Sequence, residues 1–156
     1  MAYALSGKLG VDLDATSTTK TFLLGDIVCA SDGAEYMYVR ADEALAANAF
    51  VKIDDDFECA ELTTAISGAE PTAVGCAQVA FADTEYGWVA ISGAFTGLLA
   101  ASCAADVKIG TTTTAGVLDD SYTDLVQGVK STATVGGAQA ATACFAAGRM
   151  VTNAQD

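Results

Sequence analysis

The chain has 156 residues, of which 20 are acidic, seven are basic and none is histidine, which gives a formal net charge of −13. Such an acidic chain is excluded from general nucleic-acid binding, because neutralising phosphates requires a basic surface. The length suits one domain with its own hydrophobic core, and no apolar run reaches the roughly 18 residues that a membrane-spanning helix needs.

Residues 1–21 are predicted to form an N-terminal arm or edge segment. Its apolar residues lie mainly at odd positions, which places them on one face of an extended strand. These residues are Tyr3, Leu5, Leu9 and Val11, and we predict that they contact a partner. The strand would pair with an exposed sheet edge of a neighbouring subunit or of another protein. The alternative is that it forms the first strand of the chain's own sheet.

Residues 22–156 are predicted to form a single all-β domain, either a β-barrel or β-tulip or a sandwich-like fold, with at most short helical turns. The predicted strands span residues 22–30, 36–41, 50–53, 74–82, 86–92, 107–109, 127–135 and 140–151. An Asp32-Gly33 pair supplies a tight turn between the first two strands. The segment 42–48 is predicted to form one or two helical turns that end at Asn48.

The chain also contains a repeated pattern. The sequence EYMYV at residues 35–39 recurs as EYGWV at residues 85–89, and AFVKI at residues 49–53 is similar to ADVKI at residues 105–109. A unit of strand, turn and strand that is used twice is common in β-barrels and sandwiches. We therefore predict a domain built from two similar halves. The predicted halves span about residues 25–60 and 75–118.

Four aromatic residues fall within the repeated segments, namely Tyr36, Tyr38, Tyr86 and Trp88. They could form a binding stripe for a sugar or a peptide, but packing in the core or at an interface is the favoured interpretation. Both faces of the strand 86–92 carry apolar groups, so we expect core on one side and a partner or a crossing strand on the other. Trp88 is therefore a further candidate for partner contact.

No catalytic constellation is present. Without histidine, Ser-His-Asp and Cys-His arrangements are impossible, and we predict a non-enzymatic protein with no cofactor and no metal. The acidic run Asp54–Asp56, with Glu58 and Glu61 behind it, lacks the spacing of a calcium loop. A solvated strand end is the favoured interpretation of this run, and whether it binds a cation stays open.

The five cysteines are widely spaced and form no Cys-x-x-Cys pair. Most lie beside alanine or valine, where a free thiol behaves as a small buried hydrophobe. Four of them could still converge on a metal, but buried thiols are the favoured interpretation. Free thiols indicate folding in a reducing compartment, the cytosol. The first residues have no basic stretch followed by an apolar one, so we expect no secretory signal.

Charge is distributed unevenly along the chain. Residues 26–70 hold eleven of the acids, whereas residues 131–155 hold no acid and one base, Arg149. This contrast indicates a face that is packed away, either in the core or against a partner. The alternative is that the acids only provide solubility. We predict self-association around a three-fold axis through apolar strand faces and residues 131–153.

Several segments are rich in glycine, alanine and alternating valine, and they span residues 50–53, 72–80, 92–95, 107–109 and 114–118. Together, over about residues 22–150, they resemble the small decoration or cement proteins of tailed-phage capsids. The resemblance implies a β-barrel or β-tulip domain, usually trimeric, that lies on the outside of the capsid and reinforces it against internal DNA pressure. The N-terminal segment is shorter and less polar than the long arm of some members.

We therefore expect a non-enzymatic virion structural protein, assembled in the host cytoplasm, whose partners are the major capsid protein and further copies of itself. No membrane partner is expected. A head fibre or tail structural protein is an alternative of the same broad class. An alternative of another class is a carbohydrate-binding β-sandwich that uses the aromatic stripe. A sugar binder would keep the stripe exposed to solvent, whereas a cement protein would bury it in protein contacts.

Overall fold

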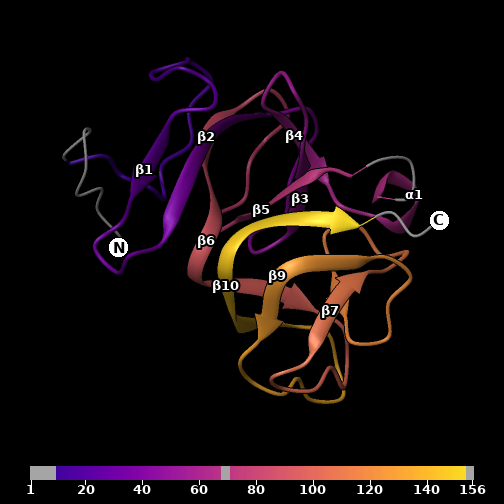
Figure 1. Cartoon of the computed structure of the whole chain (residues 1–156). Helices are drawn as coiled ribbons and strands as arrows, with labels where there is room; N and C mark the ends of the chain where they lie inside the picture. Colours follow the sequence, from indigo (N-terminus) through magenta and orange to yellow (C-terminus); the bar gives the residue numbers. More distant parts are fainter. Residues whose placement is uncertain (1–9, 68–70, 154–156) are drawn as a thin grey trace.

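The computed structural model describes residues 10–67 and 71–153, and in this part of the chain the protein is nearly all β (Figure 1). In chain order the elements are β1 (Ile27–Cys29), β2 (Glu35–Ala41), β3 (Phe50–Ile53), β4 (Glu58–Glu61), α1 (Thr64–Ser67), β5 (Ala73–Ala77), β6 (Tyr86–Leu99), β7 (Lys108–Thr111), β8 (Leu118–Asp119), β9 (Leu125–Ser131) and β10 (Ala140–Asn153). The predicted all-β fold is confirmed.

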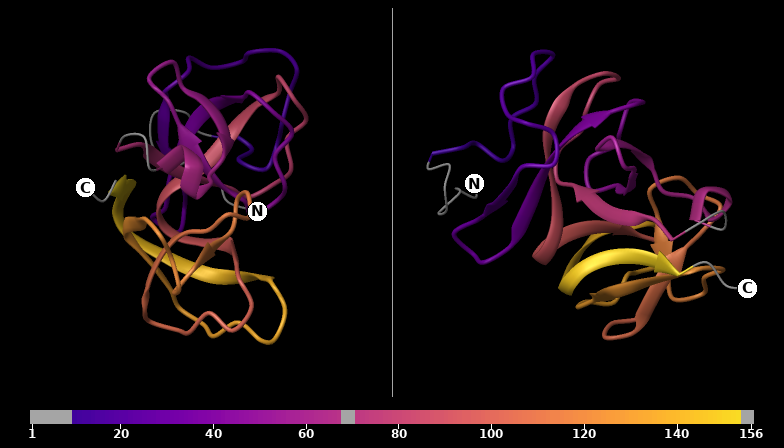
Figure 2. Two further views of the ribbon diagram at one scale, coloured as in Figure 1. Left: turned by 90° about the vertical axis from the view of Figure 1, so that its right-hand side faces the viewer. Right: turned by 45° about the horizontal axis from the view of Figure 1, so that its top comes forward.

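The strands form one ten-stranded sheet in the order β1-β2-β4-β3-β5-β10-β6-β8-β7-β9. Additional pairings of β2 with β6, β5 with β6 and β10 with β9 close this sheet into a ring. The long strand β6 pairs with β2, β5, β8 and β10 and so joins most of the molecule. Strands β7 and β9 lie on one side of the molecule and β1 and β2 on the other (Figure 2).

Strand pairings follow the same order in the two segments that share sequence similarity. In the first, β1 pairs antiparallel with β2, β2 parallel with β4, β4 antiparallel with β3, and β3 antiparallel with β5. In the second, β5 pairs antiparallel with β6, β6 parallel with β8, β8 antiparallel with β7, and β7 antiparallel with β9. The sequence of directions is the same in both segments. The domain limits and the duplication itself stay predictions.

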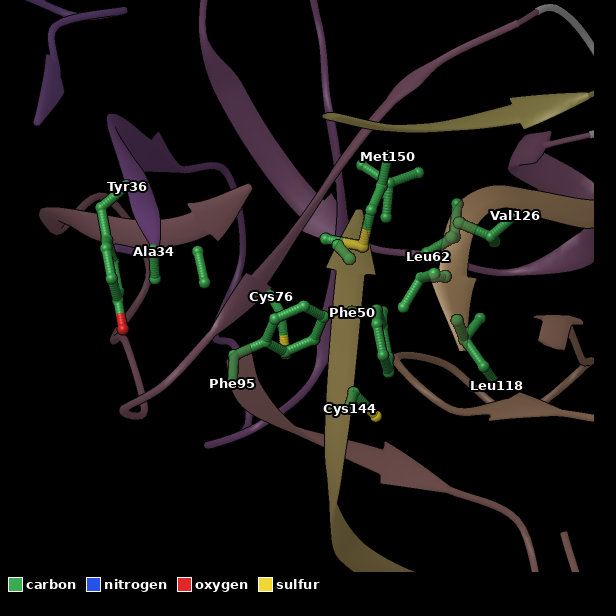
Figure 3. Packing of buried hydrophobic residues seen from close by; sticks show 14 of the residues in the cluster. Ala34, Tyr36, Phe50, Leu62, Cys76, Phe95, Leu118, Val126, Cys144 and Met150 are labelled. Atoms are coloured by element: carbon green, nitrogen blue, oxygen red, sulfur yellow. The ribbon is translucent and has the colours of Figure 1, made fainter. Parts of the chain in front are cut away.

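Two clusters of buried side chains form the core. The larger one combines Phe50 of β3, Leu62 after β4 and Cys76 of β5 with Leu118 of β8 and Met150 of β10 (Figure 3). Each large apolar side chain that is fully buried stabilises the fold by about 1.5–3 kcal/mol. The smaller cluster lies around Val39, Val51 and Val89.

Strand β6 is covered on both faces, as predicted. Trp88 and Ala90 belong to the larger cluster, whereas Val89 and Ile91 belong to the smaller one. Successive side chains of a strand point to opposite faces, so the chain itself covers both sides of this segment. A partner protein is not needed for that purpose.

The predicted helical turns at residues 42–48 are wrong. Leu45 instead forms an antiparallel bridge with Phe81, in which each N–H donates to the other residue's carbonyl at 3.0 and 3.1 Å. Both side chains are buried, so long-range packing overrides the local preference for a helix. Asn48 does adopt a positive φ of 65°, but it does so in a turn before β3.

Other strand limits also differ from those predicted. β1 begins only at Ile27, and β5 ends at Ala77, while β6 continues through Gly93 to Leu99 instead of stopping at Ser92. The register of the β2–β6 ladder shifts between Ala90 and Ser92, which marks a bulge in β6, and Gly93 directly after it has a positive φ of 86°. Strand β4 and the short helix α1 were not predicted.

Candidate functional site

The aromatic residues of the repeat are brought together by the β2–β6 pairing. The ring centroids of Tyr38 and Trp88 lie 5.0 Å apart, and Tyr86 stacks on Tyr38 at 6.3 Å. Phe22, which the sequence did not single out, contacts both Tyr38 and Trp88 at 5.3 Å. Tyr36 pairs with Ala90 further along the ladder.

Tyr36, Tyr38 and Trp88 are core residues, as the favoured interpretation predicted, while Tyr86 and Phe22 are half-buried and pack against this core. Trp88 is 1% exposed and Tyr38 3%, and the phenol oxygen of Tyr38 accepts a hydrogen bond from Thr21 N–H at 3.1 Å. Burial, with nearby acids, raises the pKa of Tyr36 to about 12. A sugar ring needs an open aromatic face for stacking, and Tyr38 and Trp88 expose almost none of their surface, although both line the pocket described next.

A pocket of about 490 Å³ lies between this aromatic cluster and residues 10–22. Its walls are mostly apolar, with Val11, Phe22 and Tyr86 among them, and Asp12 is the one charged residue among its described walls. Nothing in this wall provides the paired acids or bases of a catalytic site.

The N-terminal candidates fall into two groups. Tyr3, Leu5 and Leu9 lie outside the described residues. Val11 is 8% exposed and packs in the larger core cluster, and Ser17 forms two backbone hydrogen bonds with Tyr86 at 2.8 and 3.0 Å. From Val11 onward the segment therefore packs on its own domain, so Val11, like Trp88, offers a partner little surface.

The acidic run forms the turn between β3 and β4. Asp54 Oδ1 accepts hydrogen bonds from the N–H groups of Asp56 and Glu58 at 3.1 and 2.9 Å, while Asp55 is exposed. Glu58 forms an ion pair with Arg40. The hydrogen bonds of Asp54 are those of an ordinary solvated turn, and the ion pair joins two paired strands, which agrees with the favoured interpretation of the run.

All five cysteines are free thiols, and four of them are buried while Cys29 is half-buried. Burial raises the pKa of both Cys59 and Cys144 to about 12. Burial likewise raises the pKa of Cys76. These thiols are neutral at physiological pH and behave as small hydrophobes, as predicted.

Strand β10 presents an unusual outer face. Its even-numbered residues Cys144, Ala146 and Met150 are buried, so the odd-numbered side chains point outward. The β10 outer face consists of Ala141, Ala143, Phe145, Ala147, Arg149 and Val151, all exposed. Among the described residues, Phe145 and Val151 are two of only three large hydrophobic side chains that are exposed, at 43% and 38%.

Neighbouring strands extend this apolar surface. Phe145 pairs with Ala94 of β6, and Val151 pairs with Ala73 of β5, and both alanines are exposed. The cross-strand partner of Phe145 on the other side is Lys130 of β9. An apolar surface flanked by bases is a typical protein-contact surface on an otherwise acidic chain.

The two bases at this surface already have acidic neighbours. Lys130 Nζ lies 2.5 Å from Asp106 Oδ1, and Arg149 Nε lies 4.0 Å from Glu35 Oε2. All four side chains are partly or largely exposed, so these pairs contribute about 0–1 kcal/mol each. The bases can therefore turn toward a partner's acid at little cost.

A second cluster was not foreseen from the sequence. The ligating atoms of Cys103, Asp119 and Asp120 all lie within 4.8 Å of one another, and among the described residues they form the one group of this kind. Partial burial and the interaction with Asp120 raise the pKa of Asp119, whereas the N–H of Ala104 lowers that of Asp120. Burial raises the pKa of Cys103.

Comparisons with protein families, curated proteins and solved structures found no match for this chain. Among the described residues no helix is long and apolar enough to span a membrane. The function is therefore argued from the residues of this chain and their arrangement.

Proposed function

We propose that this chain is a non-enzymatic virion structural protein that decorates and stabilises the outer surface of a tailed-phage capsid. The observation that carries the proposal is the β10 outer face, an apolar strand face without acids on a chain of net charge −13. Surfaces of this kind are docking surfaces, because exposing them to water is unfavourable. The small all-β domain and the resemblance to cement proteins support the same reading.

A further copy of the chain is the occupant we propose for this face. A three-fold ring uses a heterologous contact, in which one patch of a subunit meets a different patch of the next. Arg149 and Lys130 would then face acids of the neighbouring subunit, of which residues 26–70 carry eleven. Such a contact combines apolar burial with charge complementarity.

The contact between two copies at the β10 outer face is expected to be weak without the capsid. Full burial of a phenylalanine or valine is worth about 1.5–3 kcal/mol, and Phe145 and Val151 have less than half of their surface left to bury. A single contact of this size is weak. A closed ring that also contacts the major capsid protein gains from several weak contacts at once.

The N-terminal segment is the proposed second contact, with the major capsid protein or a neighbouring subunit. Tyr3, Leu5 and Leu9 would supply the side-chain anchors, and main-chain hydrogen bonds would supply affinity. The carbohydrate-binding alternative is disfavoured because Tyr38 and Trp88 are buried. A head fibre or tail protein is distinguished from a decoration protein by its place on the particle.

Quantitative mass spectrometry of purified virus particles tests the proposal, with heads and tails separated before digestion. We expect the chain in the head fraction, in a fixed ratio to the major capsid protein, and accessible to protease added from outside. Presence in the tail fraction alone would support the alternative of the same class. Absence from both fractions would overturn a virion role.

A further inference from the structure

The cluster of Cys103, Asp119 and Asp120 is built from two separate parts of the chain. Cys103 lies in the loop between β6 and β7, whereas Asp119 ends β8 and Asp120 follows it. The thiol sulfur and one carboxylate oxygen of each aspartate lie within 4.8 Å of one another. The fold thus places a soft sulfur donor beside two hard oxygen donors.

Backbone hydrogen bonds hold both parts in place. Ala104 N–H donates to Asp120 Oδ2 at 3.0 Å, and Ala100 N–H donates to the carbonyl of Leu118 at 2.9 Å. On the other side, Val135 N–H donates to the carbonyl of Cys103 at 2.9 Å. The loop that carries the thiol is therefore fixed against β8, which orders the three donors before any ligand arrives.

The buried thiol of Cys103 distinguishes this cluster from a pair of surface carboxylates. Cys103 is 0% exposed, and its sulfur faces the carboxylates of Asp119 and Asp120. Its one hydrogen bond is a long contact of 3.8 Å to the carbonyl of the adjacent Ala104. Cys103 belongs to the larger core cluster, but its sulfur lies at the edge of that cluster, with one oxygen of each carboxylate within 4.8 Å, as a ligand set requires.

We propose that Cys103, Asp119 and Asp120 bind a divalent transition metal of the zinc class. Zinc accepts thiolate and carboxylate ligands in a tetrahedral set, with bonds of about 2.3 and 2.0 Å, which holds the donor atoms about 3.5 Å apart. Because the donor atoms lie within 4.8 Å of one another, they need to close by at most about 1.3 Å to reach that spacing. The carbonyl oxygen of Ala104, or a water molecule, completes the fourth position.

The sulfur ligand determines which class of metal this site would bind. Calcium and magnesium bind oxygen donors, whereas a thiolate selects zinc, cobalt or cadmium. On binding, the Cys103 S–H bond breaks, the proton goes to solvent and a metal–sulfur bond forms. The metal would tie the β6–β7 loop to β8 and so stabilise the second half of the domain, independently of the proposed function.

Titration of the full, reduced chain with Co²⁺ tests this inference, because a cobalt–thiolate bond produces a charge-transfer band. We expect the band to saturate at one equivalent and to be displaced by Zn²⁺. Zn²⁺ should also raise the melting temperature of the protein. Cys103→Ser should abolish the band, and Asp120→Asn should weaken affinity by more than about 100-fold, the upper end of the cost of losing an outer-shell partner.

Matched controls separate the site from unspecific binding. Cys144→Ser removes a different buried thiol, and Asp55→Asn removes an exposed acid of the β3–β4 turn. Both variants should keep the band. Asp120→Asn retains an oxygen that accepts the Ala104 hydrogen bond, so it should fold even if Cys103→Ser does not. No band in the wild-type chain, or a band of undiminished affinity in Asp120→Asn, would overturn the inference.

Discussion

Tyr38 and Trp88 are partners in the antiparallel β2–β6 ladder, and they are also equivalent positions of the repeated sequence EYMYV and EYGWV. The pair Tyr36–Ala90 on one side of them corresponds to the pair Tyr86–Arg40 on the other. The two similar segments therefore face each other about a local two-fold axis. The aromatic cluster lies at this axis, where it joins the two segments.

Removing the indole of Trp88 should destabilise the domain strongly. The side chain is 1% exposed and contacts both Phe22 and Tyr38, so Trp88→Ala should cost about 3–5 kcal/mol of unfolding free energy. Trp88 is the only tryptophan, so the variant has no tryptophan fluorescence to follow. Urea unfolding monitored by circular dichroism therefore measures the change. Leu23→Ala, at a side chain that is 70% exposed, should change stability by about 0.5 kcal/mol or less.

Gly93 should tolerate no side chain. Its φ is 86°, and an added Cβ would lie 2.5 Å from the Cα of Ala34. Backbone strain and the clash together predict that Gly93→Ala costs about 2–4 kcal/mol. Gly136, which has no heavy atom within 4 Å of an added Cβ, is the matched control. Equal melting temperatures for the two alanine variants would contradict the close approach of Ala34 to Gly93.

Stability should fall at alkaline pH because of the buried thiols. Burial raises the pKa of Cys59 and Cys144 from 9.0 to about 12, so the folded chain keeps protons that the unfolded chain loses. The stabilisation is complete below about pH 9 and is lost between pH 9 and 12, at about 1.4 kcal/mol per pH unit for each thiol.

Urea unfolding of the wild-type chain and of Cys59→Ala at pH 7 to 11 measures this effect. The variant is expected to be less stable at pH 7, but its stability should fall less steeply above pH 9. Parallel curves for the two proteins would show that Cys59 does not ionise on unfolding.

The β10 outer face should govern self-association without governing folding. Phe145 is 43% exposed, so Phe145→Asp should leave the melting temperature nearly unchanged. We expect the wild-type chain to form a concentration-dependent trimer at high concentration in sedimentation velocity, and we expect Phe145→Asp to abolish it, because a charge in an apolar contact must be desolvated. Leu23→Asp, elsewhere on the surface, should still form the trimer. Identical association of both variants would exclude this face as the contact.

Deleting residues 2–10 should separate docking from folding. The segment that begins at Val11 packs on its own domain, so the isolated protein should keep its melting temperature. Occupancy on particles should fall, because the proposed anchors Tyr3 and Leu5 are lost. Unchanged occupancy, or unfolding of the truncated chain, would show that the segment has no docking role.

The sequence predicted correctly those strands and turns whose structure depends mainly on neighbouring residues in the chain. Residues 50–53 form β3 with the limits expected from their apolar pattern, and the Asp32-Gly33 turn places Gly33 at a φ of 85°. The helical turns predicted at residues 42–48 failed because the competing partner, Phe81, lies far along the chain. The polar composition of Glu58–Glu61 gave no strand signal, although pairing with β2 and β3 makes it β4.

Sites that depend on tertiary arrangement could be predicted only in part. The acid-free composition of residues 131–153 predicted a contact region, and residues 140–151 were predicted to form a strand. The sequence does not say which face of such a strand the sheet covers, so Phe145 and Val151 became candidates only in the fold. Cys103 and Asp119 are similarly distant in sequence, and the β6–β8 pairing brings their segments together.

An electron cryo-microscopy map of decorated particles, at a resolution that shows side chains, tests the central claim most directly. The quantity to measure is the exposed area of Phe145 and Val151 on the particle. The account predicts copies of the chain around a three-fold axis on the capsid exterior, with both side chains buried against a neighbouring copy. A three-fold contact that left residues 131–153 in solvent would contradict it.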